Sequence, residues 1–168
     1  MIAIKNVMVA TDFGQAADAA LRYGRELAGC FGATLHVVHA METSYVGFGV
    51  ETYVPLLPDR DGELEESALR RVNSLIESAG PGPRAIAAVL PPSVPSVAII
   101  DYARDHNINL IVMGTHGRGG LAHLVMGSVA ERVVREAPCP VLTMKQSERA
   151  LVVAQIPLAT RAAAPVLT

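Results

Sequence analysis

Short apolar runs alternate with longer segments of helical spacing along most of this chain. The runs are rich in valine and apolar at consecutive positions, as strands buried on both faces of a parallel sheet are. They predict five strands, at 4–10, 33–40, 84–90, 109–113 and 141–144.

Between these runs, apolar or small residues recur every three or four positions, which is the pattern of an amphipathic helix. Glycine and proline mark several boundaries: Gly32 follows the first helical segment, and Pro91 and Pro92 end the third predicted strand. The spacing predicts four helices, at 15–31, 64–79, 95–106 and 128–137. Strict alternation of strand and helix predicts an α/β fold, in which helices cover both faces of a parallel sheet.

Two segments fall outside this alternation. Residues 41–61 show no clear period and contain three glycine or proline breaks before Pro58, which predicts a long irregular excursion that is either mobile or functional. Residues 146–168 are apolar but interrupted by polar residues and prolines, and they either extend freely or dock on a neighbour. The expected organisation is one domain over residues 1–145 and a tail over 146–168.

Composition and charge narrow the class of protein. The chain has 168 residues, 51% of them hydrophobic and 18% charged, which suits a folded domain with one core. A formal net charge of −2 argues against a broad positive surface for nucleic acid or anionic membranes. No apolar run approaches the ~18 residues that span a bilayer, and the first residues do not resemble a signal peptide. We expect a cytoplasmic protein with no nucleic-acid or membrane partner.

The segment GTHGRGGLAHLVMGS, residues 114–128, carries the most informative chemistry. Ligands of open parallel sheets bind at the carboxyl ends of strands, where the winding of the sheet reverses. If the strand order is 3-2-1-4-5, the reversal lies between the first and fourth strands, next to Thr11, Asp12 and residues 114–119. Glycines leave backbone N–H groups accessible to an anion. Ser128 opens a helix at the positive end of its dipole, and Arg118 adds a charge for a phosphate oxygen.

Structural interpretations of the same residues remain open. Ser128 and Glu131 have the spacing of a helix capping box. Asp12 hydrogen-bonds a ribose, helps to hold a metal, or caps the first helix. Val37 and Val38 either belong to the core, or one of them places its backbone against an adenine edge. The phosphate-binding GK[ST] and dinucleotide GxGxxG patterns are absent.

Other classes of site find little support. No histidine pair lies beside an acid on one predicted face, and Cys30 and Cys139 form no CxxC pair, so we expect no protein-held metal and two reduced thiols. The sequence also shows no pattern typical of a Ser-His-Asp triad or of a cysteine nucleophile.

These motifs together resemble the universal stress protein family, over residues 3–145. The spacing Gly114-x2-Gly117-x9-Gly127-Ser128 resembles the ATP-binding pattern of that family. The stretch ATDF resembles the end of its first strand, and LHVVHA, NLIVMGTHGRGG and PCPVLTMK resemble its second, fourth and fifth strands.

The resemblance implies a three-layer Rossmann-like domain of the adenine nucleotide alpha hydrolase-like type, with a five-stranded parallel sheet of order 3-2-1-4-5. It also implies ATP, with Mg²⁺ or Mn²⁺ held mainly by the phosphates, and a homodimer through the fifth strands. The implied cofactor-binding residues are Ala10, Thr11, Asp12 and Val37 for adenine and ribose, Met113 for the wall, Gly114, Thr115, His116, Gly117, Arg118 and Gly119 at one end of the loop, and Gly127, Ser128 and Val129 at the other.

The implied function is a stress-response or signalling module that binds ATP and hydrolyses it slowly at most. The alternative is a nucleotide-independent dimeric interaction or chaperone-like protein. An enzyme that forms adenylates or transfers nucleotides would need an extra domain, for which 168 residues leave little room. The sequence departs from the family pattern in two places. Residues 91–96 read PPSVPS where a Gly-x-Pro turn is usual, and the tail after Lys145 is longer than usual.

Overall fold

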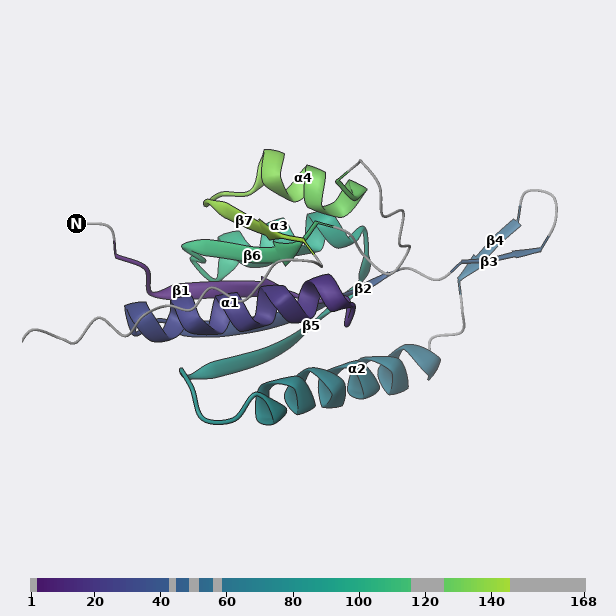
Figure 1. The fold of residues 1–168 in the computed structure, drawn as a ribbon. Helices are drawn as coiled ribbons and strands as arrows, with labels where there is room; N and C mark the ends of the chain where they lie inside the picture. The colour runs from purple at the N-terminus through teal and green to yellow at the C-terminus, as the bar shows by residue number, and fades with distance from the viewer. Residues whose placement is uncertain (1–2, 43–44, 49–51, 56–58, 116–125, 146–168) are drawn as a thin grey trace, which may run out of the picture.

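The computed structural model describes residues 3–42, 45–48, 52–55, 59–115 and 126–145 (Figure 1). Within these residues, five parallel strands form one sheet of order β5-β2-β1-β6-β7. The strands are β1 (Asn6–Ala10), β2 (Thr34–Glu42), β5 (Ala85–Ser93), β6 (Leu110–Gly114) and β7 (Val141–Met144). Counted along the predicted strands, this order is 3-2-1-4-5, so the expected fold class is confirmed.

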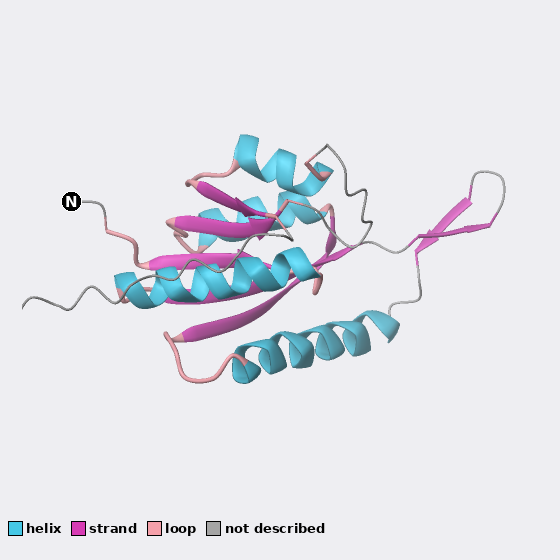
Figure 2. Ribbon diagram, in the orientation of Figure 1, coloured by secondary structure: helices cyan, strands magenta, loops and turns pink. Residues whose placement is uncertain are grey.

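Helices cover both faces of the sheet (Figure 2). They are α1 (Gln15–Phe31), α2 (Asp59–Ser78), α3 (Pro95–Asp105) and α4 (Ser128–Glu136). In β1, Val7 and Val9 pack in the core on the α1 and α2 side, while Met8 and Ala10 pack on the α3 and α4 side. This alternation with a period of two explains why the central strand is apolar at consecutive positions.

The 41–61 segment is more regular than its sequence predicts. Strand β2 extends to Glu42, and α2 begins at Asp59, five residues before the first apolar residue of its stripe. Between them β3 (Tyr45–Phe48) and β4 (Thr52–Pro55) pair in antiparallel fashion as a separate two-stranded sheet. The expectation of an irregular excursion is therefore wrong for these residues, because their tyrosines, valines and threonine favour strands despite the glycine and proline breaks.

The third predicted strand also extends further than expected. Strand β5 continues through Pro91 and Pro92 to Ser93, although the two prolines predicted its end at Leu90. Among the described strands it lies at the edge of the sheet and pairs with β2, where the register shifts between Ala40 and Glu42. An edge strand with a bulge tolerates residues that lack a backbone N–H.

The remaining boundaries agree closely with the spacing. Helix α1 has the predicted ends, with Gly32 at a φ of 63° after its last residue. Asn107, at a φ of 50°, follows α3. Among the described helices, none combines the length and the apolar character needed to cross a membrane. The predicted tail, 146–168, lies outside the described residues.

Candidate functional site

A cavity of about 730 Å³ lies at the carboxyl ends of the central strands. Its walls come from the ends of β1, β2 and β6, the first turns of α1, α3 and α4, and one side of α2. The described lining residues are Ala10, Thr11, Asp12, Phe13, Ala17, His39, Ala40, Met41, Glu42, Leu64, Ser67, Ala68, Arg71, Pro95, Ile99, Met113, Gly114, Thr115, Gly127, Ser128, Val129 and Ala130. The cavity therefore occupies the topological position at which open α/β sheets bind ligands.

The turn between β1 and α1 is held by its own side chains. The Phe13 N–H donates to Thr11 Oγ1 at 3.0 Å, and the Gly14 N–H donates to Asp12 Oδ1 at 2.9 Å. The N-cap residue of α1 is Gly14 and not Asp12, so the interpretation of Asp12 as the residue at the helix cap is wrong. Asp12 forms an Asx-turn instead, which fixes a carboxylate in the cavity wall.

The end of β6 is tied to both β7 and α4. The Thr115 N–H donates to the Met144 carbonyl at 2.8 Å, and the Thr115 carbonyl accepts from the Gly127 N–H at 2.8 Å. These bonds bring Gly114 and Gly127 to the same rim of the cavity. A Cβ added to Gly114 would lie 2.8 Å from the Cβ of Ala16, so packing against α1 by itself requires glycine there.

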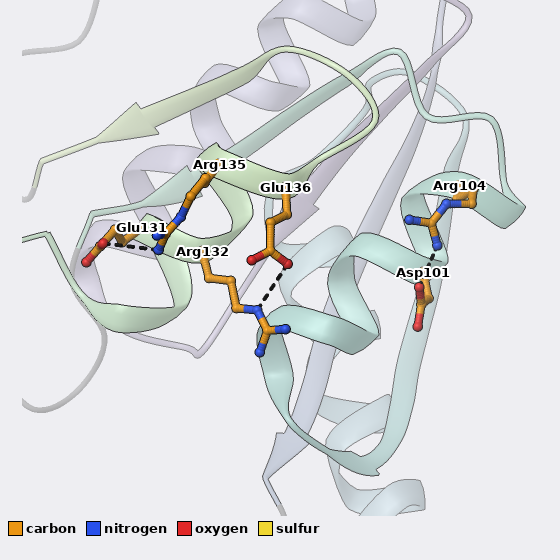
Figure 3. Close-up of polar contacts among 6 residues, drawn as sticks. All are labelled: Asp101, Arg104, Glu131, Arg132, Arg135 and Glu136. Carbon is orange, nitrogen blue, oxygen red and sulfur yellow. Dashed lines mark hydrogen bonds and ion pairs between the residues drawn. The ribbon is translucent and has the colours of Figure 1, made fainter.

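The first turn of α4 faces the cavity without a side-chain cap. Gly127 is the capping residue and Ser128 is the first helical residue. Glu131 points along the helix to Arg135, at 3.2 Å, rather than back to the first turn (Figure 3). The predicted capping box is therefore wrong. The N–H groups of the first helical residues have no acceptor within a helix, which leaves those of Ser128 and Val129 at the cavity wall.

The end of β2 contributes residues that the sequence did not predict. Val37 is fully buried in the core on the α1 side and is absent from the described lining, so a contact of its backbone with adenine stays a prediction. His39 lines the cavity instead, and its Nδ1 donates to the Thr11 carbonyl at 2.8 Å, which requires the proton on Nδ1. Its ring also packs against Phe13, with centroids 4.5 Å apart. The only sequence signal for His39 was its position near the end of a predicted strand.

Helix α2 supplies a wall that the sequence also left unassigned. Leu64, Ser67, Ala68 and Arg71 have the i, i+3, i+4, i+7 spacing of one helix face, and all four line the cavity. The Arg71 guanidinium lies over the Phe13 ring, with its carbon 4.0 Å from the centroid. The periodicity predicted the helix, but it gave no indication that this face meets the ends of β1 and β2.

Most of the described candidate residues come together at the cavity. Val37 lies elsewhere, and the positions 116–119, which include His116, Gly117, Arg118 and Gly119, lie outside the described residues. The predicted residues that line the cavity are Ala10, Thr11, Asp12, Met113, Gly114, Thr115, Gly127, Ser128 and Val129.

The described residues contain no group of three or more His, Cys, Asp or Glu side chains placed to hold a metal ion. Two carboxylates, those of Asp12 and Glu42, nevertheless line the cavity. This set does not form a protein cage, but it fits a divalent cation held mostly by ligand phosphates with one carboxylate nearby, which is the usual arrangement of Mg²⁺.

The fold and cavity define an α/β domain of the doubly wound class, with a ligand-sized cavity at the carboxyl ends of its strands. Residues 3–145 match the model of the universal stress protein family. The chain is 31% identical to the universal stress protein MJ0531 of Methanocaldococcus jannaschii over 146 residues, which cover 86% of this chain and 84% of that protein. The chain therefore belongs to the universal stress protein family.

Solved structures of the same fold include nucleotide complexes. One is a universal stress protein of Archaeoglobus fulgidus in complex with dAMP, with a TM-score of 0.58 and 26% identity over 86% of this chain and 100% of that one. Another is a universal stress protein in complex with cAMP, with a TM-score of 0.62 and 22% identity over 87% of this chain and 100% of that one.

Proposed function

We propose that this protein is an ATP-binding module of stress response or signalling. The observation that carries the proposal is the first turn of α4, which lacks a side-chain cap and faces a cavity of about 730 Å³. Free N–H groups at the positive end of a helix favour phosphate. Gly127 precedes that turn and has no side chain to obstruct a ligand. The nucleotides in the two related structures support the same class of ligand.

The remaining parts of the cavity suit the other portions of a nucleotide. Asp12 offers carboxylate oxygens to ribose hydroxyls at the end of β1, while Ala10 and Met113 supply apolar walls. Mg²⁺ accompanying the triphosphate would neutralise part of its charge, with Asp12 as the nearby carboxylate from the β1 end.

The proposed role is binding rather than rapid catalysis. Efficient phosphoryl transfer surrounds the reacting phosphate with several cations and a positioned water. Among the described lining residues, Arg71 is the one arginine and lysine is absent. We therefore propose slow hydrolysis at most, with ligand occupancy as the signal.

Titration calorimetry with ATP and Mg²⁺ tests the proposal. Gly127→Val places a branched side chain at the entrance to α4 and should reduce ATP affinity by at least tenfold, because it obstructs the anion-binding N–H groups. Gly29→Val is the matched control, since Gly29 lies outside the described lining and has open space around its Cβ position. The proposal fails if folded Gly127→Val protein binds ATP as tightly as the Gly29→Val control, or if the unsubstituted protein binds no adenine nucleotide.

A further inference from the structure

Without Arg71, the described residues that line the cavity would carry a net negative charge, which does not suit a phosphorylated ligand. The charged lining residues in the described part of the chain are Asp12, Glu42 and Arg71. Two carboxylates repel an anion, and the N–H groups of α4 carry only partial positive charge. The Arg71 guanidinium is thus the one full positive charge that these residues bring to the cavity, since arginine stays protonated at all physiological pH values.

The Arg71 guanidinium is held in place by Phe13, a residue of the cavity wall. Its guanidinium carbon lies 4.0 Å from the centre of the Phe13 ring, a distance typical of a cation–π contact. Phe13 is itself held at a positive φ of 64°, with its N–H on Thr11 Oγ1 and its ring against His39. A non-glycine residue in this conformation is maintained only by its surroundings. The strand ends therefore hold both the ring and the cation that lies on it.

Arg71 and its neighbour on α2, Arg70, differ in their ion pairs and in their position relative to the cavity. Arg70 pairs with Glu66 at 3.1 Å on the exposed side of the helix and does not line the cavity. Arg71 forms no ion pair with any residue that the structure describes. The Arg71 guanidinium carbon lies over the Phe13 ring, and a guanidinium carries five N–H donors around that carbon. Those donors are suited to oxygens of a ligand anion.

From these observations we propose that Arg71 is a ligand-contacting, specificity-determining residue, whose guanidinium donates hydrogen bonds to a phosphate of the bound nucleotide. This inference rests on the proposed nucleotide-binding function and adds a residue of α2 to it. Arg71 selects phosphorylated ligands over the corresponding nucleoside. Phe13 acts as a positioning residue, because the guanidinium that carries the donors lies over its ring.

Titration calorimetry with ATP, AMP and adenosine tests the inference on unsubstituted protein, Arg71→Gln and Arg70→Gln. Arg71→Gln should weaken ATP and AMP binding by about tenfold, the size expected for a charge-assisted hydrogen bond in a partly solvated site, and change adenosine affinity less than twofold. Arg70→Gln removes the same charge one residue away and should change all three affinities less than twofold. Arg71→Lys should give an intermediate loss, because lysine keeps the charge but not the planar donor set.

Two outcomes overturn the inference while leaving the proposed function in place. One is ATP and AMP binding to Arg71→Gln that equals binding to Arg70→Gln. The other is an equal loss for ATP, AMP and adenosine, which would indicate a structural role of Arg71. If the unsubstituted protein binds none of the three ligands, the proposed function fails and the inference fails with it.

Discussion

Gly24 of α1 lies directly against the central strand. A Cβ at this position would come within 2.2 Å of Val9 Cγ2, and Val9 is fully buried. Gly24 is one of the small residues at helical spacing within 15–31, but the closeness of its contact with Val9 follows from the packing of α1 on β1. Glycine here lowers helix propensity by about 1 kcal/mol relative to alanine, so close packing must compensate for it.

Gly24→Ala should therefore destabilise the fold, by about 1 kcal/mol net. Overpacking costs about 1–3 kcal/mol when a buried neighbour cannot move away, which exceeds the gain in helix propensity. Gly29→Ala, in the same helix but with open space around its Cβ position, should instead stabilise the protein by about 0.5 kcal/mol. Denaturant unfolding of both variants measures the two free energies. Equal stability of the two variants would contradict this account of the α1–β1 contact.

At the scale of elements, a cluster of rings joins β2 to α3. His36 is 5% exposed on β2, and its Nδ1 lies 3.0 Å from the Tyr102 hydroxyl of α3. The His106 ring, just after α3, stacks on Tyr102 with centroids 3.8 Å apart. Burial lowers the pKa of His36 below its usual 6.5, and the nearby charges of His106 and Arg84 lower it further. Burial likewise raises the pKa of Tyr102.

This contact predicts a loss of stability in mild acid. Because the pKa of His36 is lower in the folded state than in the unfolded one, the unfolded chain binds more protons as the pH falls. The stability from neutral His36 is complete above about pH 6.5, the unfolded value, and decreases below it. We expect the free energy of unfolding to drop between pH 7.5 and 5.5, and to drop less in His36→Gln. Denaturant titrations at both pH values check this, and an equal drop in the two proteins would refute the role of His36.

At the scale of the whole molecule, the two edges of the sheet differ. Strand β5 carries Pro91 and Pro92, whose missing N–H groups hinder the addition of another strand. Strand β7 contains no proline, Leu142 on it is 36% exposed, and Val134 of α4 is exposed as well. This difference favours β7 over the opposite edge as an interface, so we propose the homodimer through the fifth strand that the family resemblance implies.

Substitution of Leu142 tests the proposed dimer. The unsubstituted protein should sediment at about twice its chain mass of 17.7 kDa, and Leu142→Lys should shift it to the mass of one chain, since a buried unpaired charge is costly at an interface. Val94→Lys alters another exposed apolar residue, at the start of α3, and should leave the mass unchanged. An unsubstituted protein that sediments as a single chain at micromolar concentration would exclude the β7 dimer.

The predictions from sequence agree with the structure where an element's ends depend on its own residues, and they fail where a residue distant along the chain intervenes. Helix α1 and strand β7 end where the periodicity predicted, because that pattern records which side chains each element buries. The prediction failed where a neighbour changed the local preference. Edge position lets β5 continue through two prolines, and bonds from Thr115 and Arg135 replace the predicted capping box of α4.

The alternation of strands and helices, the parallel sheet and the glycines beside the cavity could be predicted from the amino-acid pattern, because buried apolar faces and turns leave local signals. The packing of the folded chain brings His39 and the Leu64 to Arg71 face of α2 to Thr11 and Phe13 at one cavity, while the Val37 side chain lies in the core. These residues are distant along the chain, and their convergence depends on how α2 packs over the strand ends, which no local pattern of apolar and polar positions encodes.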